Sequence, residues 1–177
     1  KALIIKPNDN TLLNIQGKLY EETQEYQKAL QVYTTLRNTN PRSLDIYKHL
    51  GLNYYNLGVL FNNKGTMEKN SSAAKKLIKQ SEEYFSAAVT IFKDVLASDP
   101  TSLKYMEALA TSYQCLSNSS EMSALNNKIS SLGGNTVSAS SIPSLMAFSD
   151  NNVPTSPPTE TSTTAKNYNS QLFTTPA

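Results

Sequence analysis

The residues that could do chemistry are few. His49 is the one histidine among the 177 residues and Cys115 the one cysteine. A single histidine excludes a histidine metal cluster and a two-histidine zinc motif within the chain. A single cysteine excludes an internal disulfide and a multi-cysteine metal site. We therefore expect His49 to be an ordinary surface or groove histidine, with a functional role as the alternative.

The other reactive groups are equally isolated. No Lys, Arg or His stands beside Cys115 to lower the pKa of its thiol, so we expect a buried or inert thiol rather than a nucleophile. The carboxylates of Glu21 and Glu22, and those of Glu82 and Glu83, diverge by about 100° around a helix and are expected to be solvated. The six glycines form neither a Walker loop nor a dinucleotide fingerprint. The sequence thus predicts no catalytic residue, no cofactor and no metal, and no enzyme.

Charge is distributed unevenly along the chain. Of the 30 charged side chains, 27 precede Gly133, and the last 45 residues contain eight Ser, eight Thr and five Pro. Such a composition has too little apolar surface to offset the entropy of ordering, so residues 133–177 are expected to form a disordered tail. The net charge of +2, with both signs interspersed, argues against nucleic acid as a partner. No apolar run is long enough for a membrane span.

The elements that position these residues recur. Pro7 and Pro41 are 34 residues apart, and the stretch of sequence that ends at Pro100 is similar to those that end at Pro7 and Pro41. Because proline cannot continue a helix, these positions mark helix ends, as in stacked helical hairpins. The 34-residue helical repeat has the pattern W-x2-L-G-x2-Y, then A-x3-F, then P. Two units follow it and a third begins and fades: Leu13, Gly17, Tyr20, Ala29, Tyr33 and Pro41; Tyr47, Leu50, Gly51, Tyr54, Ala88, Phe92 and Pro100; Met106, Leu109, Ala110 and Tyr113.

On these residues the chain resembles the tetratricopeptide-repeat family. The resemblance implies an all-α solenoid of antiparallel helical hairpins with a low-complexity C-terminal tail. Its expected parts are the end of a truncated repeat (1–9), a repeat (10–43), a repeat with an elongated hairpin (44–102), a degenerate or capping repeat (103–132) and the tail (133–177). The partial first repeat leads us to expect further repeats upstream in the same protein. Self-association through the truncated edge or the tail is then possible.

Residue size supports the repeat pattern. Gly17 and Gly51 at matched mid-helix places suggest close approach of neighbouring helices. The recurring tyrosines and phenylalanines are expected to pack in the core between layers rather than to stack on a cofactor.

The unit 44–102 holds 25 more residues than a standard repeat, and their helical apolar spacing predicts a longer hairpin. Gly65 is the expected stop of its first helix, and Asn70 the cap of its second, with a tip loop near residues 63–70. Asn70 and Asn118 also match a glycosylation acceptor. The arms should project about 15–18 Å. Such a hairpin resembles those of tetratricopeptide-repeat proteins of Bacteroidetes, and the resemblance implies the bacterial periplasm or cell envelope.

A protein–protein interaction scaffold is the function that the resemblance implies. In the family, the first helix of each repeat lines a concave groove for a peptide or protein segment. Lysines in the groove favour acidic partners, and Tyr55 is the expected aromatic anchor. Ala108 stands where a carboxylate clamp needs a basic residue. The partner-binding positions carried onto this sequence are Asn14, Lys18, Glu21, Lys48, Leu52, Tyr55, Asn56, Lys104, Glu107 and Thr111.

The alternative is a structural or export-related terminus in which the tail is the interacting element. Residues 171–175 of the tail have the aromatic and β-branched content of a strand that could join another protein's sheet.

Overall fold

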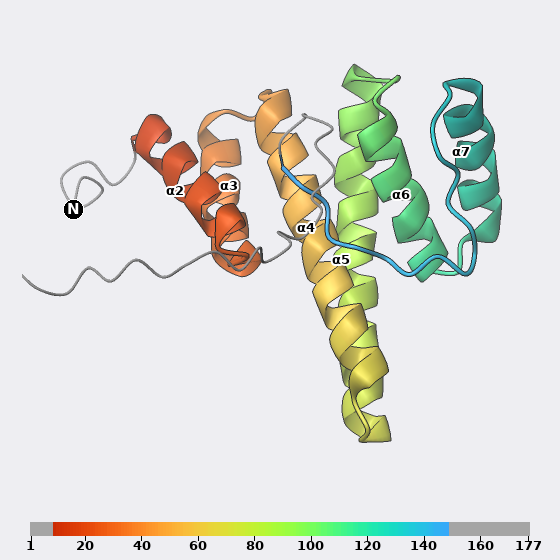
Figure 1. The fold of residues 1–177 in the computed structure, drawn as a ribbon. Coiled ribbons are helices and arrows are strands. Elements are labelled where there is room, and N and C mark those ends of the chain that lie inside the picture. The colour runs from red at the N-terminus through yellow and green to blue at the C-terminus, as the bar shows by residue number, and fades with distance from the viewer. Residues whose placement is uncertain (1–8, 149–177) are drawn as a thin grey trace, which may run out of the picture.

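The computed structural model describes residues 9–148, and within them it is all-helical, as the sequence predicts (Figure 1). The predicted truncated repeat before residue 9 and the predicted strand at 171–175 lie outside the described residues. The helices are α2 (Asn10–Glu22), α3 (Tyr26–Thr39), α4 (Leu44–Met67), α5 (Ser71–Ser98), α6 (Leu103–Cys115) and α7 (Ser119–Ser131).

Consecutive helices pack against one another in chain order from α2 to α7. Pro41 and Pro100 lie in the turns that follow α3 and α5, where the absence of an N–H costs no helical hydrogen bond. Asp9 caps α2 by accepting hydrogen bonds from the backbone N–H groups of Thr11 and Leu12, at 2.9 and 3.2 Å. Asn70 caps α5 in the same way, as expected. Asn118 stands at the N-cap of α7 without a side-chain capping bond.

Glycines at seven-residue intervals let α4 approach α5 closely. A Cβ built on Gly51 would lie 2.6 Å from the ring of Phe92, and one on Gly58 would lie 2.8 Å from the ring of Phe85. One on Gly65 would lie 2.7 Å from Ile78. Successive contacts therefore lie seven residues later in α4 and seven residues earlier in α5. This contact explains why the predicted stop at Gly65 was wrong: α4 runs on to Met67 because Gly65 packs against its partner helix.

The same arrangement joins α2 to α3. A Cβ on Gly17 would lie 2.7 Å from the ring of Tyr33, which is fully buried. The glycine of the repeat pattern is thus the place where the large residue of the following helix packs.

Helices α4 and α5 contain 24 and 28 residues, against 13 or 14 in the others, and they extend together beyond the rest of the bundle (Figure 1). The turn between them is residues 68–70, shorter than the expected loop at 63–70. In the described range 9–148, no helix has both the length and the apolar character needed to cross a bilayer.

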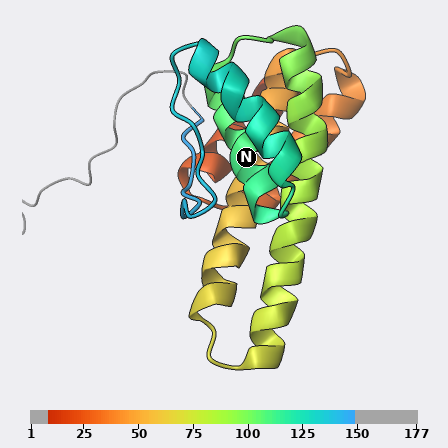
Figure 2. The same ribbon diagram turned by 90° about the vertical axis from the view of Figure 1, so that its right-hand side faces the viewer.

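After α7 the chain runs back without helix across α6 and α4, along one side of the bundle (Figures 1 and 2). We call residues 133–148 the return segment. They belong to the predicted tail, of which residues 149–177 lie outside the described range.

Candidate functional site

The return segment is held by a buried asparagine on α4. The side-chain amide of Asn56 donates from Nδ2 to the carbonyl oxygen of Met146 at 3.0 Å, and its Oδ1 accepts from the N–H of Met146 at 2.9 Å. Both backbone groups of one residue are therefore satisfied by one side chain, as a neighbouring β-strand would satisfy them. Asn56 is fully buried, and the two bonds to Met146 are partly buried.

Two further amides hold the rest of the segment. Asn126 on α7 makes the same pair of bonds with the backbone of Val137, at 2.7 and 2.9 Å. Gln114 at the end of α6 donates from Nε2 to the carbonyl oxygens of Ala139 and Ser141, at 3.1 and 2.7 Å. We call Asn56, Gln114 and Asn126 the amide clamp. The clamp bonds only to backbone groups of the return segment, which turns at residues 139–140, so it holds the chain without selecting its side chains.

Apolar side chains supply the selective contacts. Val137 packs against the cluster that includes Met106 and Ile129, while Met146 and Phe148 pack against the main core. The ring of Phe148 stacks on the imidazole of His49, with centroids 5.9 Å apart and planes inclined by 9°. The ring of Tyr33 also stacks on His49, with centroids 4.6 Å apart and planes inclined by 8°. The imidazole thus contacts two nearly parallel aromatic rings.

A buried carboxylate fixes the orientation of His49. Both oxygens of Glu21 lie 2.9 Å from Nδ1 of His49, and the carboxylate also accepts from the Asn53 amide and from the Tyr33 hydroxyl. Burial and the nearby Glu21 raise the pKa of Tyr33 above its ordinary value, so its hydroxyl remains a donor. The prediction that Glu21 is solvated was wrong because α2 directs this carboxylate between α3 and α4, where Tyr33 of α3 and His49 and Asn53 of α4 replace water as donors. Its neighbour Glu22 is exposed, as expected.

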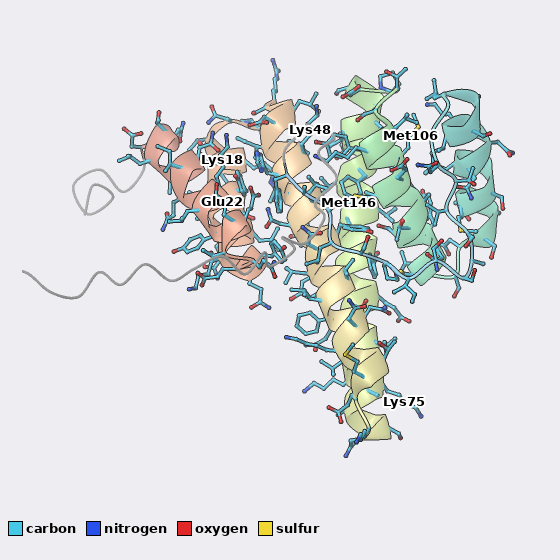
Figure 3. The ribbon with its side chains drawn as sticks, in the orientation of Figure 1. Lys18, Glu22, Lys48, Lys75, Met106 and Met146 are labelled. Atoms are coloured by element: carbon cyan, nitrogen blue, oxygen red, sulfur yellow. The ribbon has the colours of Figure 1, made fainter. Side chains whose placement is uncertain are left out.

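A cleft of about 810 Å³ adjoins the Phe148 ring between α2, α3, α4 and residues 145–148. Its ionisable lining groups are Lys18, Glu21, Glu22, Asp45 and His49. Figure 3 shows Lys18 and Glu22 along α2 and Met146 beside α4. Because carboxylates outnumber lysines in this cleft, the cleft gives no electrostatic preference for acidic partners.

Six of the residues expected to bind a partner lie beside the return segment. Tyr55, Glu107 and Thr111 line a space of about 210 Å³ beneath it, and Asn56 bonds to it. Lys18 and Glu21 line the larger cleft. Burial raises the pKa of Glu107, and the backbone of Asn135 opposes that rise by hydrogen bonding to the carboxylate.

The other four expected residues lie elsewhere. Lys48 pairs with Asp99 at 3.3 Å, and both Lys48 and Lys104 lie over the ring of Tyr105. Asn14 lines a small cleft between α2 and the turn before α4. Leu52 is a core residue, 1% exposed.

The structure corrects the expectation that Tyr55 is an exposed aromatic anchor. Tyr55 is 1% exposed, and its ring packs on Phe85 and Phe92, with centroids 5.8 and 6.4 Å away. The Tyr55 side chain points from α4 toward α5, so it forms part of the core beneath the return segment.

Sequence reasoning missed the residues that complete the site. Gln114 and Asn126 lie in the third unit, where the repeat pattern fades, and nothing in their spacing distinguishes them from other surface amides. Phe148 did carry a signal: residues 145–148 form an apolar run within a segment of Ser, Thr and Pro.

The Cys115 thiol is expected to react slowly in the folded chain. Burial raises its pKa to about 11. At pH 8 this leaves about a hundredfold less thiolate than an ordinary cysteine has, and thiolate is the reactive form. The rate of labelling by a disulfide reagent should therefore rise steadily with pH, and urea should restore the ordinary rate. Equal rates in the native and unfolded chain would contradict this burial.

No protein-family model matches the chain, and no curated protein is similar to it. Among residues 9–148, no cluster of three or more His, Cys, Asp or Glu could hold a metal ion.

Proposed function

We propose that this chain is a helical-repeat scaffold of the tetratricopeptide-repeat type, which binds an extended segment of a protein and has no catalytic role. The observation that carries the proposal is the pair of hydrogen bonds between the buried Asn56 amide and the backbone of Met146. A buried amide on a helix is costly unless both its donor and its acceptor are used. An extended backbone uses both.

The arrangement of the helices supports the repeat assignment. Helices pack with their neighbours in chain order, and Gly17 and Gly51, which are 34 residues apart, play the same packing role in α2 and α4. The lengthened pair α4 and α5 fits a repeat with an elongated hairpin. In such an array the first helices, here α2, α4 and α6, present one continuous face.

A peptide-display selection tests the proposal. We define the opened chain as the full chain with Met146→Ser and Phe148→Ser, which removes two apolar anchors of the return segment and leaves the helices unaltered. Random peptides selected on the opened chain should bind it, and Asn56→Leu should weaken their binding at least about tenfold, since two hydrogen bonds at about 1 kcal/mol each are lost. Lys75→Ala, at an exposed position in the first turns of α5 near the tip of the α4–α5 pair, is the matched control and should leave binding unchanged.

Failure of the selection to enrich any peptide would reject the scaffold function. So would selected peptides that bind the Asn56→Leu variant as tightly as the parent.

A further inference from the structure

The return segment occupies the face that the proposed function assigns to a partner. Its contacts are of two kinds: backbone bonds to the amide clamp and side-chain contacts at Val137, Met146 and Phe148. Neither kind depends on the segment being joined to α7. A separate chain with the same local sequence could make every one of them.

The spacing of the side-chain contacts is specific. Residues two apart in an extended chain point to the same side, and Met146 and Phe148 both pack against the core. Leu145 and Ala147, which alternate with them, are exposed. The segment therefore presents a medium-sized apolar side chain and, two residues later, an aromatic one.

The fit of the return segment is incomplete. The cleft of about 810 Å³ remains beside the Phe148 ring, and Ile142 and Leu145 are 84% and 37% exposed. A ligand with a larger aromatic group, or one that continues into the cleft past Lys18 and Asp45, would bury more surface than the chain's own segment does.

We propose that this face binds, in trans, an extended partner segment with a Met- or Leu-sized side chain followed two residues later by an aromatic side chain, and that residues 135–148 occupy the site as an intramolecular copy of that ligand. The inference rests on the proposed scaffold function. To that function it adds the side-chain pattern of the ligand. It also adds competition between the ligand and residues 135–148, because a tethered copy acts at an effective concentration in the millimolar range. A partner must outcompete the copy, which weakens its apparent affinity.

The test uses a fluorescein-labelled peptide with the sequence of residues 135–148, titrated with the full-length wild-type chain and with the opened chain. We expect the opened chain to bind the peptide at least about tenfold more tightly, because its own segment no longer competes for the contacts made by Met146 and Phe148. The single variant Phe148→Ala should give an intermediate affinity. Circular dichroism should show unchanged helix in both variants, since the substitutions lie after α7.

Two controls test the site and the pattern. Asn56→Leu in the opened chain should abolish the gain in affinity. A peptide in which the residues corresponding to Ala147 and Phe148 are exchanged should bind about tenfold more weakly, because its ring no longer faces His49.

Four results would overturn the inference. Equal affinities of the wild-type and opened chains would mean that the segment does not compete. Equal binding of the exchanged peptide, or display-selected peptides that depend on Asn56 but lack the pattern, would reject the ligand pattern while the scaffold function stands. A concentration-dependent dimer of the wild-type chain, cross-linked between Met146 and α4 of another copy, would assign the face to the segment of a second copy.

Discussion

Replacing Phe85 with alanine is expected to lower the free energy of unfolding by about 3–5 kcal/mol, which is the usual cost of removing a buried phenylalanine side chain. Phe85 is fully buried, packs edge-on against Tyr55 and rests on Gly58. The resulting cavity would lie between α4 and α5, midway along the glycine contact. Urea unfolding followed by circular dichroism measures the loss, and Ser86→Ala, at the next and exposed position, is the control.

The effect of Gly58→Ala should depend on which residue stands at position 85. In the wild-type chain the added Cβ would lie 2.8 Å from two ring carbons of Phe85, and such overpacking costs about 1–3 kcal/mol, more than the gain of up to about 1 kcal/mol in helix propensity. In the Phe85→Ala chain the ring is absent and the propensity gain remains. The same substitution should therefore destabilise one background and stabilise the other.

This change of sign separates close packing from a general intolerance of substitution in α4. If Gly58→Ala destabilised both backgrounds equally, the contact between Gly58 and Phe85 would not limit the approach of the helices. A double-mutant cycle gives the coupling directly, and we expect it to exceed about 1 kcal/mol.

The packing of the helices could largely be predicted from local pattern. Gly17 and Gly51 stand at equivalent places in the sequence pattern that predicts repeats. A small residue in a helix indicates close approach where a large residue follows at the matching position of the next helix. Gly58 and Gly65 extend the contact along α4 at intervals of seven residues from Gly51, but the sequence suggested a helix stop at Gly65. The choice between a stop and a contact depends on Ile78 of α5, whose distance from Gly65 follows only from the pairing of the two helices.

The candidate site was predictable only where one helix sufficed to define it. The first-helix rule directed attention to Asn56, Glu107 and Thr111, all of which lie beside the return segment. It could not separate Asn56, which faces the segment, from Tyr55, which faces α5. One residue along a helix changes direction by about 100°, so the assignment depends on the crossing of α4 and α5.

Long-range contacts explain the remaining differences. Glu21 is buried because His49 and Asn53, 28 and 32 residues later, provide donors for it. The return segment packs because Asn56 meets Met146, 90 residues away. Composition suggested that residues 133–148 lack the apolar surface to order themselves, and it could not show that side-chain amides on three other helices would satisfy their backbone.

Asn56→Leu is expected to release the Met146 end of the return segment while leaving the helices folded. Leucine has the same number and branching of side-chain heavy atoms as asparagine but neither donates nor accepts, so the N–H and carbonyl of Met146 would be left without partners unless the segment moves into water. At about 1 kcal/mol for each of the two bonds, the ratio of bound to released segment should fall roughly 10- to 30-fold. Amide hydrogen exchange at Met146 should accelerate by the same factor.

Asn126→Leu is the matched variant at the other end of the segment. Because Asn126 holds Val137 with the same pair of bonds, its replacement should accelerate exchange at Val137 and affect Met146 much less. The intervening Gln114 continues to hold Ala139 and Ser141, which separates the two ends. Local acceleration at one end in each variant would show that the amides act as independent holds on the backbone. Acceleration of the whole segment in both variants would mean that it binds and releases as one unit, and unchanged exchange at Met146 in Asn56→Leu would show that the Asn56 amide does not hold it.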